Sequence, residues 1–190
     1  MKKLYHVSQT PDLKVLEPRL STHGKPYVYA TTNLELALLF GAHHMGDFDG
    51  KIGTDDKGKP YFYEAYKGAF DDRYKGRKCY VYEVEPDTFE MGRTNFKGEV
   101  VSSKPVKIIN CTEVKDLYTH LDKLIEDRKI TLLEYNNNPE YVSRINEFIK
   151  DRIKTFHVLE DPSSEAYTFC MSKFPSLMKE VENENTIQAE

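Results

Sequence analysis

The sequence predicts an α+β protein in which a β-rich front is followed by a helical rear. Up to about residue 110, short runs rich in β-branched and aromatic residues alternate with Gly and Pro, a pattern typical of strands and turns. Beyond residue 110, apolar residues recur at helical spacing. We therefore expect a β-rich domain over residues 1–110, a helical extension or cap over 111–181 and a flexible tail over 182–190.

The front half contains the expected strands, which lie at residues 3–8, 27–31, 59–66, 78–84, 99–103 and 106–110. A short helix is expected over 34–40, because Thr32 or Asn33 can cap its start and Gly41 can end it. Residues 42–60 are rich in Gly, Asp and His. They are expected to form a long loop or an irregular hairpin, with a turn at 56–58.

The rear half is predicted to hold three helices. The first carries an apolar stripe between residues 114 and 125. The second begins at Asn138, a good N-cap residue, with Pro139 in the first helical position. The third starts near Asp161, and Pro175 should kink or break it.

Composition and charge exclude several classes of protein. No run of 18 apolar residues exists, so no membrane span is expected, and the start of the chain lacks the apolar stretch of a signal peptide. Three widely spaced cysteines fit a reducing cytoplasm. Residues 1–110 carry 17 Lys or Arg against 15 Asp or Glu, and residues 111–190 carry 10 against 16. Nucleic-acid binding is therefore not indicated, and the motifs of Rossmann, P-loop and α/β-hydrolase enzymes are missing.

Three short segments of the front half contain side chains that can carry chemistry. They are Tyr5-His6-Val7-Ser8, then Tyr27-Val28-Tyr29-Ala30-Thr31 leading into a helix, and finally Gly98-Glu99-Val100-Val101-Ser102. Together they resemble the His-Tyr-Glu pattern of the diphtheria-toxin and PARP-like ADP-ribosyltransferases. The resemblance covers about residues 1–110. It implies a split β-sheet core and an enzyme that uses NAD as its substrate.

The resemblance also implies roles for the three central residues. Glu99 would be catalytic, stabilising the positive charge that develops on the ribose as nicotinamide leaves and accepting a hydrogen bond from the 2′-hydroxyl. Tyr29 would stack on the nicotinamide ring. His6 would hydrogen-bond the ribose on the adenine side and hold the cofactor bent.

Further cofactor-binding residues follow from the same resemblance. Ser8 would bind the nicotinamide ribose, and the backbone of Val7 would meet the carboxamide. Thr31, at the end of the predicted strand that carries Tyr29, would also bind the cofactor. Phe40 could fill the place of a second aromatic residue. Two positions depart from the family pattern: Val7 stands where Gly is frequent, and Lys97 stands two residues before Glu99, where protein-modifying members often carry Glu or Gln.

Other residues compete for a role in the site. Glu83, Glu85 and Glu90 are alternative carboxylates, although Glu99 fits the family pattern better. Arg19 could meet a cofactor phosphate, and His23 could line the cleft. A run from His43 to Asp49 contains two His and two Asp, but its spacing favours a mobile loop near the cleft over a metal site.

The leading functional hypothesis is therefore an NAD-dependent ADP-ribosyltransferase that passes ADP-ribose to an unknown acceptor or to water. The alternative is a catalytically inactive descendant of this fold that serves as a ligand-binding or protein-interaction module. A third hypothesis is a structural or partner-binding protein in which the acidic helices carry the function. The sequence does not choose the acceptor or the oligomeric state.

Overall fold

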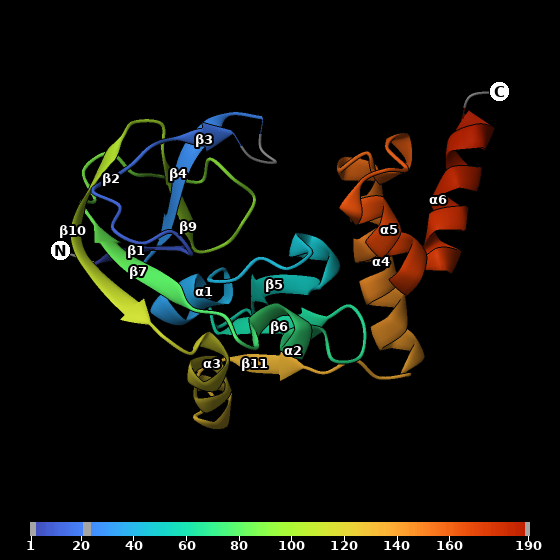
Figure 1. Cartoon of the computed structure of the whole chain (residues 1–190), viewed down its shortest axis with the longest axis horizontal. Coiled ribbons are helices and arrows are strands. Elements are labelled where there is room, and N and C mark those ends of the chain that lie inside the picture. The colour runs from blue at the N-terminus through green and yellow to red at the C-terminus, as the bar shows by residue number, and fades with distance from the viewer. Residues whose placement is uncertain (1–2, 21–23, 189–190) are drawn as a thin grey trace. The chain divides into compact units, whose positions relative to one another are not determined.

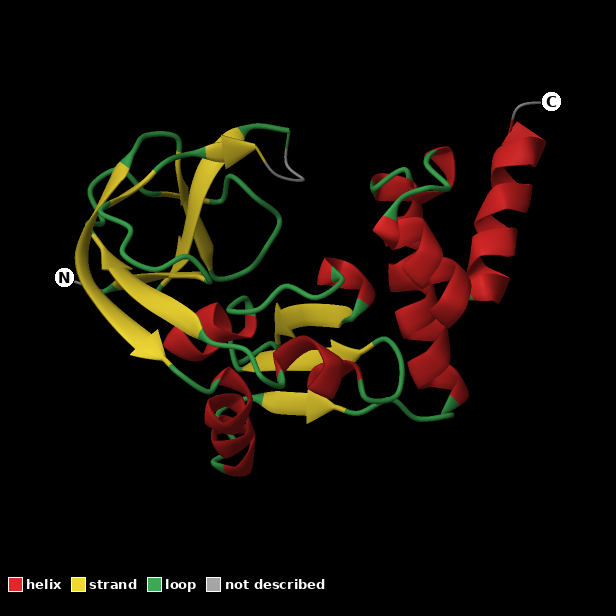
Figure 2. Cartoon of the chain, in the orientation of Figure 1, coloured by secondary structure: helices red, strands yellow, loops and turns green. Residues whose placement is uncertain are grey.

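The computed structural model describes residues 3–20 and 24–188, with side chains as far as residue 184. It is a mixed α/β structure with a large antiparallel sheet, a smaller sheet and, within the described residues, six α-helices; Figure 2 shows the two kinds of element in separate colours. The chain forms two compact units. The sheet unit comprises Met1–His43, Ile52–Phe62 and Tyr74–Thr131, and the helical unit comprises His44–Lys51, Tyr63–Arg73 and Leu132–Glu190.

The large sheet has eight strands and belongs to the sheet unit (Figure 1). Its path is β2-β10-β7-β1-β4-β9-β8, and β3 pairs with β4 outside this path. The strands are β1 (Leu4–Ser8), β2 (Val15–Leu16), β3 (Arg19–Leu20), β4 (Pro26–Thr31), β7 (Cys79–Val84), β8 (Glu90–Met91), β9 (Glu99–Ser102) and β10 (Val106–Val114). The five longer ones confirm predicted strands, whereas β2, β3 and β8 are two-residue strands too short to leave a sequence pattern.

One face of this sheet carries an apolar core. Its buried members are Leu4, Leu16, Val28, Ala30, Tyr82, Val84 and Val106. Because side chains alternate along a strand, β4 contributes Val28 and Ala30 to this core face and presents Tyr27, Tyr29 and Thr31 on the other. This alternation decides which residues of β1, β4 and β9 can meet.

Two helices of the sheet unit have caps that are visible in the sequence. Helix α1 (Leu34–Leu39) begins at Asn33, whose side chain accepts a hydrogen bond from the Leu36 amide, as predicted. Helix α3 (Leu117–Glu126) begins at Asp116, whose carboxylate accepts from the Thr119 amide. The expected helix began near residue 114, but β10 runs to Val114, so the boundary expected at residue 110 falls inside a strand.

Residues 42–60 are more regular than a long loop. They contain a 3-10 turn η1 (Gly46–Phe48) and strand β5 (Gly50–Thr54), which lies beside β6 (Pro60–Glu64). Asp55 builds the intervening turn, because its carboxylate accepts from the amides of Lys57 and Lys59. The hairpin alternative is thus confirmed. The third strand of this sheet, β11 (Thr131–Leu133), was not predicted, since a three-residue strand has no measurable period. Each of these three strands has residues in both units.

The helical unit is built around α4 (Pro139–Thr155), which starts at Asn138 with Pro139 in its first turn, as predicted. The other elements are α2 (Ala69–Tyr74), whose last residue belongs to the sheet unit, the 3-10 turn η2 (Val158–Glu160), α5 (Glu165–Lys173) and α6 (Pro175–Gln188). Ile145, Ile149 and Ile153 are buried along one side of α4. Pro175 separates α5 from α6, as expected, and the segment expected to be a tail from residue 182 is helical to Gln188.

Candidate functional site

Three adjacent strands bring the predicted site segments together. Tyr5 on β1 lies opposite Thr31 on β4, and Thr31 in turn lies opposite Glu99 on β9. Directly opposite residues in an antiparallel pair project from the same face. Gly98, which precedes β9, adopts φ +92°, a left-handed conformation that Gly takes readily. The sheet therefore carries Tyr5, Thr31 and Glu99 in one row, on the face away from the apolar core.

Tyr29 shares this face with Glu99. It lies opposite Val101, which places Glu99 diagonally across from it, roughly 7–8 Å away and within reach of an aromatic side chain. The phenolic oxygen of Tyr29 and Oε2 of Glu99 are both shielded from solvent. The ring of Tyr29 also meets that of Tyr27 edge to face, with centroids 6.1 Å apart. The residue predicted to stack on the nicotinamide ring and the predicted catalytic carboxylate are thus neighbours.

His6 joins the same strand in a different way. Its Nδ1 lies 2.8 Å from the carbonyl oxygen of Tyr29. A carbonyl oxygen can only accept, so Nδ1 carries the proton and Nε2 holds the lone pair. Alternation along β1 places His6 with Leu4, on the face opposite to Tyr5. The structure therefore brings Tyr29 and Glu99 together on one face, and ties His6 to the backbone of Tyr29 rather than to that face.

Burial favours the neutral form of the His6 imidazole. Burial lowers the pKa of His6, and the nearby positive charge of Arg19 lowers it further, while the hydrogen bond to Tyr29 opposes both effects. A neutral imidazole can donate through one nitrogen and accept through the other. At His6 the donating nitrogen is committed to the protein, which leaves Nε2 as the acceptor.

The remaining predicted cofactor residues have local partners. The hydroxyl of Ser8 accepts from the Thr10 amide at 3.1 Å. The hydroxyl of Thr31 accepts from the Asn33 amide at 3.1 Å, and so shapes the entry to α1.

Val7 and Phe40 contribute apolar surface. Val7 is half-buried and follows Tyr5 on the same face of β1. The Phe40 ring packs edge to face on Phe96, with centroids 5.7 Å apart.

The competing residues lie in less suitable surroundings. Glu83 pairs with Lys3 at 2.9 Å, and Glu90 pairs with Arg93, while Glu85 is exposed. Arg19 lies opposite Tyr27 and is exposed. His23 lies outside the described residues. Among these carboxylates, Glu99 alone lies diagonally across from Tyr29.

An open depression of about 540 Å³ lies at the end of the same row. Its lining residues are Lys3, Tyr5, Thr32, Asn33 and Glu35. Tyr5 lines this depression and also lies opposite Thr31 in the row. No role for Tyr5 was predicted from the sequence. The only available signal was its place beside His6 in the first strand, and a Tyr in a strand is too common to be informative.

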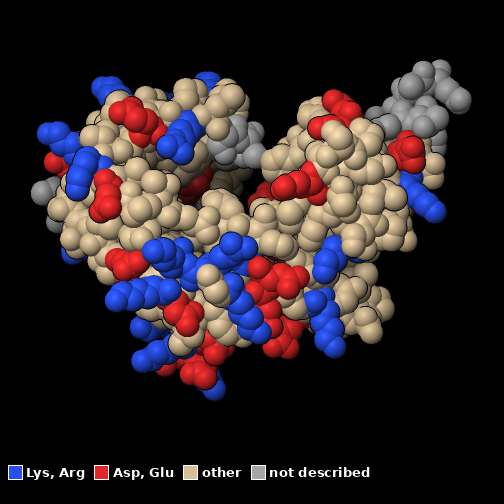
Figure 3. Space-filling view, in the orientation of Figure 1, with Lys and Arg blue, Asp and Glu red and all other residues tan. Residues whose placement is uncertain are grey.

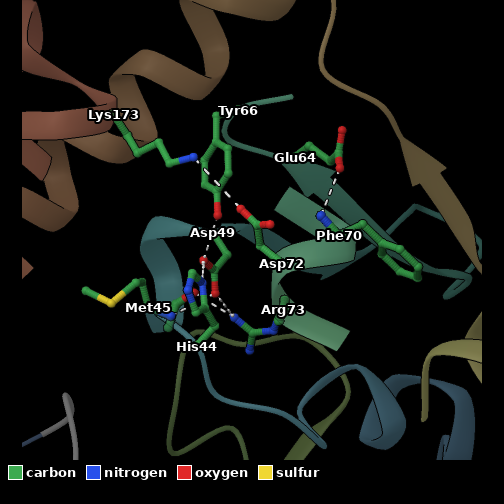
Figure 4. Close-up of polar contacts among 10 residues, drawn as sticks. His44, Met45, Asp49, Glu64, Tyr66, Phe70, Asp72, Arg73 and Lys173 are labelled. Atoms are coloured by element: carbon green, nitrogen blue, oxygen red, sulfur yellow. Dashed lines mark hydrogen bonds and ion pairs between the residues drawn. The ribbon is translucent and has the colours of Figure 1, made fainter. Parts of the chain in front are cut away.

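The part of the predicted His43–Asp49 run that begins at His44 forms a polar cluster in the helical unit (Figure 4). The buried carboxylate of Asp49 lies 2.8 Å from Nδ1 of His44 and 3.3 Å from Nη1 of Arg73. It also accepts from the Met45 amide and from the Tyr66 hydroxyl. Asp49 is therefore committed to protein donors that hold this turn in place, and no group of three potential metal ligands occurs within the described residues.

The surface seen in Figure 3 mixes the two signs of charge. Lys and Arg side chains are interspersed with Asp and Glu instead of forming a stripe. Among the helices that the structure describes, none has the length and apolar character needed to cross a bilayer. Comparison with protein-family models, with curated proteins and with solved structures finds no match for this chain.

Proposed function

We propose that the chain is an ADP-ribosyltransferase-like enzyme that binds NAD at the β1–β4–β9 row, cleaves the nicotinamide–ribose bond and passes ADP-ribose to an acceptor or to water. One observation carries the proposal: Tyr29 and Glu99 are diagonal neighbours on one face, and His6 is hydrogen-bonded to the backbone of that same Tyr29. The three segments lie on adjacent strands, with Tyr29 and Glu99 on one face and His6 on the other, and this adjacency supports the proposal.

The chemistry follows from the residues present. Loss of nicotinamide leaves positive charge on the ribose, as in glycoside hydrolysis. A carboxylate at Glu99 stabilises that charge, and its effect is largest where water is excluded. Tyr29 offers an aromatic face to the nicotinamide ring. The neutral His6 offers Nε2 to a ribose hydroxyl.

The fold gives secondary support to the proposal. A split β-sheet core contains two sheets, and the protein has one of eight strands and one of three, although β11 of the smaller sheet lies beyond the front part of the chain. The three cysteines are free, which suits the reducing cytoplasm in which we propose that the enzyme works. Exposed Lys97, two residues before Glu99, disfavours a cationic acceptor such as arginine.

A non-catalytic NAD-binding module is the second candidate. The observation that favours it is the burial of Glu99 Oε2, because an oxygen that solvent does not reach is also shielded from substrate. In this case the row would bind the dinucleotide without breaking it. NAD would then raise the melting temperature of the protein by an amount that grows with the logarithm of its concentration relative to its Kd, but no nicotinamide would appear.

Nicotinamide release from NAD by the purified full chain distinguishes these possibilities. Glu99→Gln keeps the shape of the side chain and removes its charge, so we expect turnover to fall roughly 10²–10³-fold. Glu90→Gln is the matched control, because it makes the same change at an exposed carboxylate on the neighbouring strand β8. It should release nicotinamide like the unaltered protein. Equal release by Glu99→Gln and the unaltered chain would exclude Glu99 as the catalytic carboxylate, and NAD-dependent stabilisation without any release would support the binding module.

A further inference from the structure

The open depression at the end of the row has walls from three neighbouring parts of the sheet unit. Lys3 and Tyr5 come from β1 and the residue before it, Thr32 and Asn33 come from the turn after β4, and Glu35 comes from the first turn of α1. Its volume of about 540 Å³ falls within the range of small-ligand sites, roughly 300–1,000 Å³. The depression is therefore large enough to hold a small molecule.

Regular elements hold these walls in place. Strand β1, which carries Tyr5, is paired with β4 on one side and with β7 on the other. Both ends of the Asn33 amide are engaged, because Oδ1 accepts from the Leu36 amide at 2.9 Å and Nδ2 donates to the Gly58 carbonyl oxygen at 3.4 Å. Leu36 is only 1% exposed, which anchors the helix that carries Glu35. The lining groups are thus positioned before any ligand arrives.

Three oxygen-bearing groups of this depression have no polar partner among residues 3–20 and 24–188. They are the carboxylate of Glu35 and the hydroxyls of Tyr5 and Thr32. Glu35 is half-buried, and a carboxylate that loses part of its hydration without gaining a counter-charge raises the free energy of the protein. A ligand that supplies donors and positive charge would remove this cost.

The other charged group at the depression is already neutralised. The ammonium of Lys3 lies 2.9 Å from Oε2 of Glu83, and this ion pair raises the pKa of Lys3 through its hydrogen bond and its charge. Since the charges of Lys3 and Glu83 offset each other, the carboxylate of Glu35 leaves the depression with a net negative charge. A cation is therefore preferred over an anion.

We propose that this depression binds the primary ammonium group of a small polar ligand, which donates to Glu35, Tyr5 and Thr32. An ammonium has three N–H donors, and the depression offers three acceptor groups on three different elements. An aromatic ring such as that of Tyr5 also attracts a cation to its face. Binding here is independent of the proposed function, because none of these three side chains has a role in NAD cleavage.

The first test uses probes of one length and three charges. NMR spectra of the full chain are recorded during titration with n-butylammonium, n-butanol or butyrate. We expect saturable shifts of the backbone amide signals of Tyr5, Thr32 and Glu35 with butylammonium alone. An equal response to butanol would mean that apolar contact drives binding, and tighter binding of butyrate would mean that Lys3 does. Either result, or no saturable response to butylammonium, would overturn the proposal.

The second test separates Glu35 from the overall negative charge of the chain. Glu35→Gln keeps the length of the side chain, and we expect the Kd of butylammonium to rise roughly tenfold. The matched control is Glu126→Gln, a change at an exposed carboxylate of α3, which should leave the Kd unchanged. Equal losses of affinity in the two variants would show non-specific attraction and would contradict the proposed site.

Glu35 has one competing role that the same variant tests. It lies in the first turn of α1, where a negative charge also stabilises a helix. If this is its only role, Glu35→Gln lowers the urea midpoint of unfolding and leaves the Kd of butylammonium as it was, and the proposal fails. Tyr5→Phe gives a further check, because it keeps the ring and removes one acceptor. We expect this variant to bind butylammonium more weakly than the unaltered chain, and an unchanged Kd would exclude the Tyr5 hydroxyl from the site.

Discussion

The guanidinium of Arg73 and the carboxylate of Asp49 lie 3.3 Å apart, and both side chains are almost completely buried. Arg73 also donates to the carbonyl oxygen of Gly46 at 2.7 Å. The pair therefore anchors the turn that contains His44 and Gly46 to helix α2. A buried ion pair of this kind need not stabilise the fold relative to apolar packing, but breaking it from one side is costly.

Asp49→Asn should strongly destabilise the helical unit. The change removes the negative charge that lies 3.3 Å from the buried Arg73 guanidinium, and we expect the free energy of unfolding to fall by about 3–5 kcal/mol. The matched control is Asp47→Asn, because Asp47 pairs with Arg152 at 3.3 Å in a partly exposed contact, which contributes about 0–1 kcal/mol. Urea unfolding followed by circular dichroism measures both. Similar losses in the two variants would contradict the role given to Asp49.

Gly41→Ala should destabilise the sheet unit through overpacking. A Cβ at this position would lie 2.9 Å from Sγ of Cys79, 2.9 Å from the carbonyl oxygen of Leu38 and 3.0 Å from Leu117. We expect a loss of about 1–3 kcal/mol in the free energy of unfolding. Removing Sγ by Cys79→Ala relieves one of these contacts, so the double variant should lose less than the sum of the single losses. Strict additivity in this urea-unfolding cycle would argue against the contact.

The three thiols should react at very different rates. Burial raises the pKa of Cys79 and of Cys170 to about 12, so at pH 8 neither forms an appreciable amount of the reactive thiolate. Cys111 is exposed. We expect iodoacetamide to alkylate Cys111 alone in the folded protein, as read by mass spectrometry of peptides. Labelling in urea is the control and should modify all three, whereas early labelling of Cys79 would mean that its pocket opens readily.

The stability of the sheet unit should fall on acidification through His6. Its pKa is lowered in the folded state, so between that value and the ordinary pKa of about 6.5 the unfolded chain binds more protons. The contribution of His6 is therefore complete above about pH 6.5 and is lost progressively below it. Urea unfolding at pH 7.5 and pH 5.5 should show a smaller difference in His6→Gln than in the unaltered protein. His120→Gln, a change at an exposed histidine, should leave that difference as it was.

Much of the local structure could be predicted because it depends on neighbours in sequence. Asn138 and Pro139 mark the start of α4, and Asn33 marks the start of α1, since a cap bonds an amide two or three residues away. The alternating strand at 78–84 was visible for the same reason. In contrast, the two-residue strands and β11 leave no periodic signal, and they exist because neighbouring strands offer them hydrogen bonds.

The same distinction applies to the candidate site, because its residues were visible in the sequence but their arrangement in space was not. His6, Tyr29 and Glu99 were chosen from three short segments, but their relation to one another depends on register. A shift of one residue between β4 and β9 would move Glu99 to the core face. Tyr5 gained its significance only from its place opposite Thr31 on β4.

The sequence by itself determined the class of the fold, the caps of its main helices and the residues worth considering for chemistry, because propensity, periodicity and capping act over a few residues. Only the tertiary structure decided that residues 44–51 and 63–73 belong with the rear helices, that Asp49 is bound to Arg73, that Tyr29 and Glu99 share a face, and that His6 is bound to the carbonyl oxygen of Tyr29. These relationships arise from strand register and from burial of charged pairs, which depend on segments far apart in the chain and leave no local pattern.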